Sequence, residues 1–218
     1  MRALAPLTDD LFAPAMVQLV DDAEGGIRYW PEVIDPLTAR AWFDRLRASA
    51  AWTHLQRPMY DRIVDVPRLL ANYAVDALPD DLPLAGLLAC VQTKAPAPYS
   101  RIGMNLYRDG HDSVAMHGDK LHTVATGHPI TLVSLGAPRR MLIRATSGAR
   151  DTVAVDLAPG SVLSMSHASQ STHEHGIPKT RRAQGARISV VFRVRPPSSV
   201  GTGGVAGVGA TQVAMGHR

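Results

Sequence analysis

Short apolar runs separated by turn residues dominate the second half of the chain. Such runs alternate with Gly, Pro and Asp, which is typical of β-strands joined by turns. The predicted strands are Ile102–Tyr107, Ser113–Gly118, Ile130–Leu135, Arg140–Arg144, Val153–Leu157, Ser161–Met165 and Arg187–Arg195. This succession of short strands indicates an all-β barrel or sandwich.

The first half of the chain mixes extended and helical patterns. Ile27–Trp30 is predicted as a strand, and Asp35-Pro36 offers a helix N-cap followed by proline at the first helical position. A helix over 36–50 follows, because apolar residues recur at helical spacing at Leu37, Ala41, Trp42, Leu46 and Ala50.

Two further segments complete this half. Trp52–Tyr73 contains short apolar pieces and two prolines, which predicts strands joined by turns. Leu82–Cys90 is a compact apolar run that predicts a second helix, capped by an acidic residue of Asp80-Asp81.

Composition favours one domain of an ordinary globular protein. A chain of 218 residues with 45% hydrophobic residues can bury one core. We therefore assign 26–196 to a single domain, 1–25 to an N-terminal extension and 197–218 to a disordered tail, since the tail is low in large apolar residues.

Cysteine usage and targeting signals point to the cytoplasm. The single cysteine, Cys90, excludes an internal disulfide framework and is expected in the core. Pro6, Asp9 and Asp10 interrupt any signal-peptide pattern, and no apolar run approaches the roughly 20 residues of a membrane span. The formal charge of +4 favours a polyanionic partner.

The triplet His117-Gly118-Asp119 is a candidate half of a metal site. In an extended strand residues i and i+2 share a face, so this imidazole and carboxylate could bind one ion together. Two histidines and one carboxylate with open positions suit non-haem Fe(II). The candidate second histidine is His175, with His173, His167 and His122 as alternatives.

Two arginines on the last predicted strand suggest an anion site. Arg187 and Arg193 are six residues apart and therefore face the same side. The other face carries Ile188, Val190 and Phe192, which indicates a buried strand whose charges need partners. Guanidinium groups bind carboxylates bidentately.

The ordered set of motifs resembles the AlkB-like Fe(II)/2-oxoglutarate dioxygenases, from about Val66 to Arg195. The pattern Asn-x-Tyr, His-x-Asp, His and Arg-(five residues)-Arg occurs here as Asn105/Tyr107, His117/Asp119, His175 and Arg187/Arg193. Bacterial members also share the segments Ser134–Arg140 and Glu174–Lys179.

This resemblance implies a mainly β (α+β) double-stranded β-helix, or jelly roll, with N-terminal helices outside one sheet. It implies a catalytic core over 99–195 and a substrate lid over 52–75. His117, Asp119 and His175 would hold Fe(II), with dioxygen and 2-oxoglutarate as co-substrates. Arg187 with Tyr107 would bind the distal carboxylate, and Arg193 with Asn105 would lie near the carboxylate at the iron.

The resemblance further implies oxidative dealkylation of alkylated bases in DNA, or in RNA, with release of an aldehyde. The substrate would be single-stranded or a base flipped out of a duplex, and we expect the enzyme to act as a monomer. Candidate substrate contacts in the lid are Tyr60, Arg68 and Tyr73; the two tyrosines stack on the base or pack between sheet and helix. Candidate phosphate contacts, or else solvated charges, are Arg139, Arg140, Lys179, Arg181 and Arg182.

Some positions depart from the family pattern. Leu121 stands where many nucleic-acid-repairing relatives have a carboxylate that contacts the base, so recognition differs or is broader here. Ser189 and Val191 replace the usual Asn and Thr of the arginine strand. Leu121 also leaves open the same chemistry on a protein side chain or small molecule. A non-catalytic nucleic-acid-binding module of the same fold is a third hypothesis.

Overall fold

A computed structural model describes residues 15–59, 62–148 and 151–196, with only the backbone described for 57–59 and 62–64. The predicted substrate contact Tyr60 and the predicted tail 197–218 lie outside the described residues. None of the helices in the described part has the length and apolar character needed to cross a membrane.

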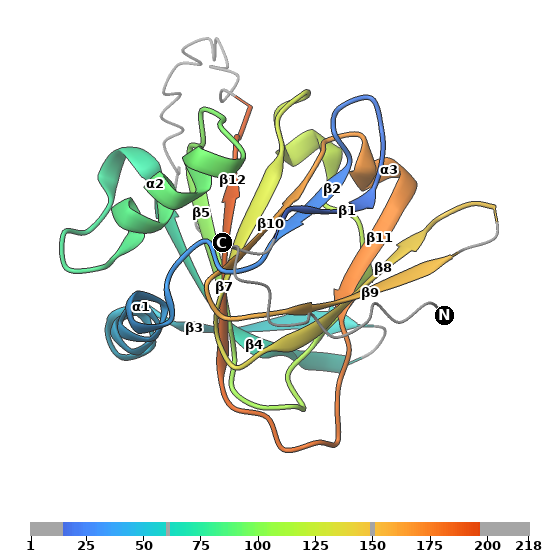
Figure 1. Ribbon diagram of the computed structural model, residues 1–218. Helices are drawn as coiled ribbons and strands as arrows, with labels where there is room; N and C mark the ends of the chain where they lie inside the picture. Colours follow the sequence, from blue (N-terminus) through green and yellow to red (C-terminus); the bar gives the residue numbers. More distant parts are fainter. Residues whose placement is uncertain (1–14, 60–61, 149–150, 197–218) are drawn as a thin grey trace, which may run out of the picture.

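The described residues form twelve strands arranged in two antiparallel sheets (Figure 1). The large sheet has the order β1-β2-β10-β7-β12-β5-β4-β3, and the small sheet has the order β6-β11-β8-β9. The strands are β1 Val17–Val20, β2 Ile27–Trp30, β3 Thr53–Met59, β4 Arg62–Ala74, β5 Arg101–Tyr107, β6 Val114–His117, β7 Ile130–Gly136, β8 Arg139–Ala145, β9 Thr152–Leu157, β10 Ser161–Met165, β11 His173–Ile177 and β12 Arg187–Arg193.

Short helices complete the described chain. They are α1 Pro36–Ser49, α2 Leu84–Lys94 and α3 Ser169–Thr172, with the 3-10 turns η1 Val75–Ala77 and η2 Leu121–Thr123. The helices α1 and α2 lie outside the large sheet, away from the small sheet (Figure 1). This confirms the predicted jelly roll with helices covering one sheet.

Helix α1 begins as predicted, and its buried face includes only part of the predicted apolar set. The Asp35 carboxylate accepts hydrogen bonds from the backbone N–H groups of Leu37 and Thr38 at 3.1 and 3.0 Å. Ala39, Phe43 and Leu46 are the buried positions. Leu37, which we expected on the buried face, is 84% exposed. The side chains that face the sheet are those of Ala39, Phe43 and Leu46.

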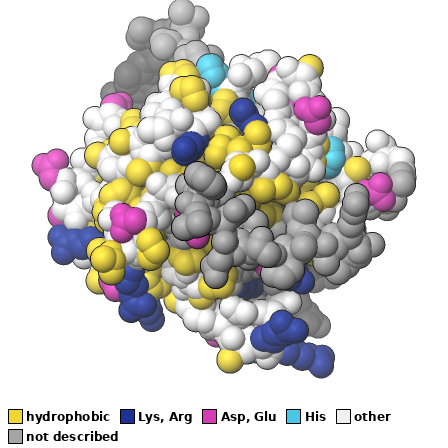
Figure 2. All heavy atoms as spheres, in the orientation of Figure 1, with side chains coloured by type: hydrophobic (Ala, Val, Ile, Leu, Met, Phe, Trp, Pro, Cys, Tyr) yellow, Lys and Arg dark blue, Asp and Glu magenta, His cyan; other side chains and the backbone are white. Residues whose placement is uncertain are grey.

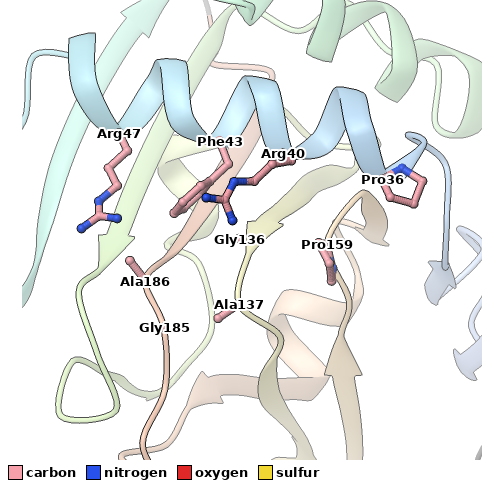
Figure 3. Close-up of a pocket in the computed structure, with 9 residues that line it drawn as sticks. All are labelled: Pro36, Arg40, Phe43, Arg47, Gly136, Ala137, Pro159, Gly185 and Ala186. Carbon is pink, nitrogen blue, oxygen red and sulfur yellow. The ribbon is translucent and has the colours of Figure 1, made fainter.

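Close packing under α1 requires a glycine at the end of β7. Gly136 has φ +83°, and a Cβ there would lie 2.5 Å from the Phe43 ring and from the carbonyl oxygen of Ala186. Figure 3 shows α1 lying over this point, with Phe43 directed toward the strand ends. A side chain at Gly136 would therefore push the helix off the sheet.

Helix α2 differs from its prediction at the N-terminus. It begins two residues later than expected and ends four residues later, its N-cap is Pro83, and no side chain caps it. The predicted acidic cap is wrong, because Leu82-Pro83 separates the acidic pair from the first turn. Cys90 is half-buried against the core, as a free thiol.

Two apolar cores follow from the alternation of side chains along the strands. One fills the space between the large sheet and the helices and includes Ile188, Val190 and Phe192. The other lies between the two sheets and includes Tyr107, Ile143 and Val191. The second core surrounds the predicted site residues. The segment assigned to an N-terminal extension contributes β1, which pairs with β2 at the edge of the large sheet.

Candidate active site

The small sheet places two histidines side by side. His117 ends β6 and pairs in register with His175 on the neighbouring strand β11. Their ring centroids are 4.6 Å apart. The register therefore brings His175 opposite His117, whereas the alternative ligand His173 pairs with Ala145 and has its Nδ1 atom 2.9 Å from the Thr172 hydroxyl.

The surroundings of both rings suit metal ligation. His117 Nδ1 lies 2.8 Å from the carbonyl oxygen of Ala115, and when Nδ1 carries the proton the Nε2 lone pair is left for an ion. Burial lowers the pKa of His175 to about 4, and the neighbouring His117 acts in the same direction. At neutral pH His175 is thus the uncharged imidazole that metals bind.

Asp119 is near this pair but engaged elsewhere. Strand β6 ends at His117, one residue before the predicted end at Gly118, and Asp119 lies beyond it. Its two carboxylate oxygens accept hydrogen bonds from Arg193 Nη2 at 3.0 and 3.1 Å. In this arrangement no three His, Cys, Asp or Glu side chains among the described residues are grouped closely enough to hold a metal ion.

Arg187 is a buried cation with unfilled donors. It is 0% exposed, and its Nε donates to the Ser134 hydroxyl at 2.9 Å. Its terminal nitrogens Nη1 and Nη2 have no hydrogen-bond partner among the described residues. Burial lowers the pKa of Arg187 to about 10, which still leaves it charged at neutral pH. A buried charge of this kind needs an anion, and a carboxylate fits its two free nitrogens.

Tyr107 and Ser134 shape the surroundings of that guanidinium. Tyr107 pairs in register with Arg187, and the guanidinium carbon lies 5.3 Å from the centre of the Tyr107 ring. Ser134 opens the Ser134–Arg140 segment shared with bacterial members, but its contact with Arg187 was not predicted, because a hydroxyl within the apolar run of β7 does not identify its partner.

The predicted lid residue Arg68 lies against the predicted co-substrate residue Asn105. Arg68 Nε donates to Asn105 Oδ1 at 2.8 Å, and Nη1 donates to the carbonyl oxygen of Ser113 at 3.1 Å. Asn105 therefore contacts Arg68, while Arg193 contacts Asp119. Asn105 and Arg193, which we expected together near the carboxylate at the iron, thus have different hydrogen-bond partners.

The other lid tyrosine packs away from the site. Tyr73 packs against the core between the large sheet and the helices, and its hydroxyl accepts a hydrogen bond from the Ala51 N–H at 3.0 Å. Of the two alternatives for Tyr73, packing between sheet and helix is the one observed. Leu121 lies in η2, close in sequence to Asp119, and its side chain is 40% exposed.

The predicted phosphate contacts divide into two kinds. Arg139 is 3% exposed and donates to the carbonyl oxygens of Asp109, Asp112 and Pro178 at 2.8–2.9 Å, a buried position that does not suit a phosphate contact. Arg140 is exposed and pairs with Asp156 at 2.9 Å.

A basic hollow lies beyond the end of β11. It has a volume of about 460 Å³, and Arg139, Arg140, Lys179 and Arg182 are among its lining residues. Figure 2 shows Lys and Arg side chains at the lower end of the visible face, over the β11–β12 loop. A second hollow of about 430 Å³ lies under α1 (Figure 3). The predicted metal ligands line neither of these two hollows.

The described residues form a jelly roll with a histidine pair on the small sheet and a buried arginine on the large sheet. The sequence profile of the 2OG-Fe(II) oxygenase superfamily matches residues 26–193. The chain therefore belongs to the 2OG-Fe(II) oxygenase superfamily.

Curated relatives narrow this assignment to AlkB-like proteins. DNA oxidative demethylase ALKBH2 of Bos taurus is 31% identical over 103 residues, 44% of this chain and 37% of the relative. The alpha-ketoglutarate-dependent dioxygenase alkB homolog 3 of Rattus norvegicus is 24% identical over 194 residues, 80% of this chain and 66% of the relative. The chain thus spans little more than a third of ALKBH2.

Solved structures support the fold. The structure of OsALKBH1 superposes with a TM-score of 0.55 at 15% identity, covering 78% of this chain and 97% of that one. The AlkB-like resemblance and the jelly-roll prediction are both confirmed.

Proposed function

We propose that this protein catalyses Fe(II)- and 2-oxoglutarate-dependent oxidative dealkylation of alkylated bases in nucleic acid, with DNA as the expected substrate. The observation that carries the proposal is Arg187, a fully buried guanidinium whose two terminal nitrogens have no hydrogen-bond partner among the described residues. It lies on the same strand as Arg193, which contacts Asp119, and the small sheet holds a histidine pair.

The distal carboxylate of 2-oxoglutarate is the proposed partner of Arg187. A dicarboxylate that enters the barrel can fill both free nitrogens, while Ser134 fixes Nε and Tyr107 covers one face of the guanidinium. Arg193, on the same face of β12, is the proposed contact for the carboxylate near the metal.

His117, His175 and Asp119 are the proposed Fe(II) ligands. The two imidazoles are already adjacent, and Asp119 completes the set when its carboxylate leaves Arg193. When bound, the iron supplies oxidation by dioxygen, coupled to decarboxylation of 2-oxoglutarate to succinate and hydroxylation of an N-linked alkyl carbon. The hydroxylated group then leaves the base as an aldehyde.

Nucleic acid is supported as the substrate class by the relative ALKBH2, a DNA oxidative demethylase, and by charge. Lys179, Arg181 and Arg182 are exposed on the β11–β12 loop and can neutralise phosphates. The target base has to leave the stack to reach a site between two sheets.

A second candidate keeps the chemistry and changes the substrate to a protein side chain or a small molecule. Leu121 favours it, because this exposed apolar side chain near Asp119 cannot accept a hydrogen bond from a base.

A product assay by mass spectrometry separates these candidates. The iron-loaded protein, 2-oxoglutarate and oxygen are incubated with oligonucleotides that carry N-methyl or etheno-bridged bases, single-stranded and duplex. Restored bases that appear with stoichiometric succinate support the proposal. Failure to restore any of these bases would remove the nucleic-acid claim, even if succinate still forms.

A further inference from the structure

The turn that carries Gly118 and Asp119 packs directly onto α3. The Asp119 backbone N–H donates to the side-chain oxygen of Gln170 at 3.0 Å. A Cβ at Gly118 would lie 2.5 Å from the backbone carbonyl oxygen of the same Gln170. One residue, distant in sequence from the turn, therefore contacts both positions that follow His117.

Gln170 is held in one orientation. It is 6% exposed, and its amide nitrogen lies 3.3 Å from the Ser169 hydroxyl and 3.5 Å from the carbonyl oxygen of Ser166. Because the Asp119 N–H can only donate, the amide oxygen of Gln170 has to face it. The donor end of the amide accordingly points back into its own helical turn.

The segment that carries Gln170 is anchored to the β1–β2 turn. The Ser166 hydroxyl donates to Asp22 at 2.6 Å and accepts from the Ser169 N–H at 2.9 Å. Asp22 also accepts from the backbone N–H groups of Glu24 and Gly26, both at 2.8 Å. The Ala168 N–H donates to the Glu24 carboxylate at 2.8 Å. A continuous hydrogen-bond chain thus runs from Asp22 through Ser166, Ser169 and Gln170 to Asp119.

We propose that Gln170 is a positioning residue, which holds the turn after β6 so that the Asp119 carboxylate can reach an ion bound by His117 and His175. Since α3 leads directly into β11, the same short segment fixes the start of the strand that carries His175. Gln170 therefore couples the two halves of the ligand set. This inference rests on the proposed metal site.

The test is metal affinity, measured on the metal-free full-length protein by titration with Co(II) and followed by calorimetry and by the visible absorption of the bound ion. Gln170→Met keeps the side-chain length and removes the acceptor. We expect its Co(II) dissociation constant to rise by ~10–100-fold, the range typical of outer-sphere partners of metal ligands. Gln170→Glu, which keeps an acceptor oxygen, should stay within ~3-fold of the natural protein.

Ser171→Ala is the matched control, because Ser171 is exposed on the same turn and its hydroxyl donates to the Ala168 carbonyl. It should bind Co(II) like the natural protein. If Gln170→Met does not fold, Gln170→Asn replaces it: its oxygen is one methylene too short to reach Asp119, so the same loss is expected. Unchanged affinity and absorption in Gln170→Met, or in Gln170→Asn where that variant replaces it, would overturn the positioning role. No Co(II) binding by the natural protein would instead contradict the proposed metal site.

Discussion

Two buried arginines lie against the same tyrosine ring and differ in what fills their donors. The guanidinium carbons of Arg139 and Arg187 are 5.6 and 5.3 Å from the centre of the Tyr107 ring. Arg139 donates to three backbone carbonyls, whereas the terminal nitrogens of Arg187 meet no acceptor among the described residues. Similar burial therefore accompanies two different roles.

The comparison distinguishes an arginine that stabilises the fold, Arg139, from one with donors left for a ligand, Arg187. Arg139 closes the end of the barrel by joining the loop after β5 to the end of β11, so its charge is solvated by the protein itself. Arg187 is compensated only in part, by the Ser134 hydroxyl and by Tyr107, and in our proposal a ligand carboxylate supplies the rest. The distinction rests on the unfilled donors, since burial alone does not reveal a binding site.

The largest expected effect comes from the proposed metal ligands, because 2-oxoglutarate bound at Arg187 can react only at a metal. Asp119→Ala should lower turnover by more than ~100-fold, since even outer-sphere partners contribute ~10–100-fold. Succinate formation measures this. His173→Ala is the control, and we expect near-normal turnover from it; a loss as large as that of Asp119→Ala would reassign the second histidine.

The two arginine substitutions should change the free energy of unfolding in different directions. Arg139→Met leaves three carbonyls without a charged donor and should lower the free energy of unfolding by about 2–4 kcal/mol. Arg187→Met removes a charge that is only partly compensated and should leave that free energy unchanged or raise it. Urea unfolding of the ligand-free proteins measures both.

Arg140→Met serves as the surface reference in this experiment. Its exposed pair with Asp156 should be worth under ~1 kcal/mol. A strong loss of stability in Arg187→Met would show that Arg187 is architectural too.

The stability of the metal-free protein should fall as the pH is lowered from about 6.5 to 4. The unfolded chain takes up a proton on His175 near its ordinary pKa of about 6.5, while burial keeps the folded pKa at about 4. The slope from this group is at most ~1.4 kcal/mol per pH unit. Replacing His175 by Gln should reduce the slope, and replacing the exposed His111 should not.

A smaller effect is expected from the competition for Asp119. Arg193→Met frees the carboxylate and should strengthen Co(II) binding without co-substrate by about fivefold, the equivalent of about 1 kcal/mol. Calorimetric titration measures it, with Arg144→Met, which loses a pair with Glu174, as control. Weaker Co(II) binding by Arg193→Met would mean that Arg193 supports Asp119 instead of competing for it.

Much of this arrangement could be predicted from the chain because it follows short-range periodicity. The even spacing of Arg187 and Arg193 places both on the inner face of β12, and the alternation of Ile188, Val190 and Phe192 faces the helices. Asp35-Pro36 likewise marks the start of α1 at the correct residue.

Features that depend on contacts distant in sequence could not be predicted in this way. The sequence around Arg139 suggests a surface charge like that of Arg140. Its burial depends on three backbone carbonyls from two loops that are distant in sequence, and the neighbouring residues do not reveal them. Gln170 lies in a polar, Ser-rich stretch that resembles a loop, and its burial arises from the Gly118 turn packing on it. The pairing of Asp119 with Arg193 joins two motifs whose sequence patterns suggest separate partners.

The most direct test of the central claim is calorimetric titration of 2-oxoglutarate into Mn(II)-loaded protein, with and without Arg187. The natural protein should bind one equivalent, and Arg187→Met should bind at least ~30-fold more weakly, because a buried charge pair loses one partner. 2-Oxobutyrate, which lacks the distal carboxylate, should bind both proteins equally and weakly. Affinities for 2-oxoglutarate within ~3-fold of each other would contradict the assignment of Arg187 as the carboxylate-binding residue.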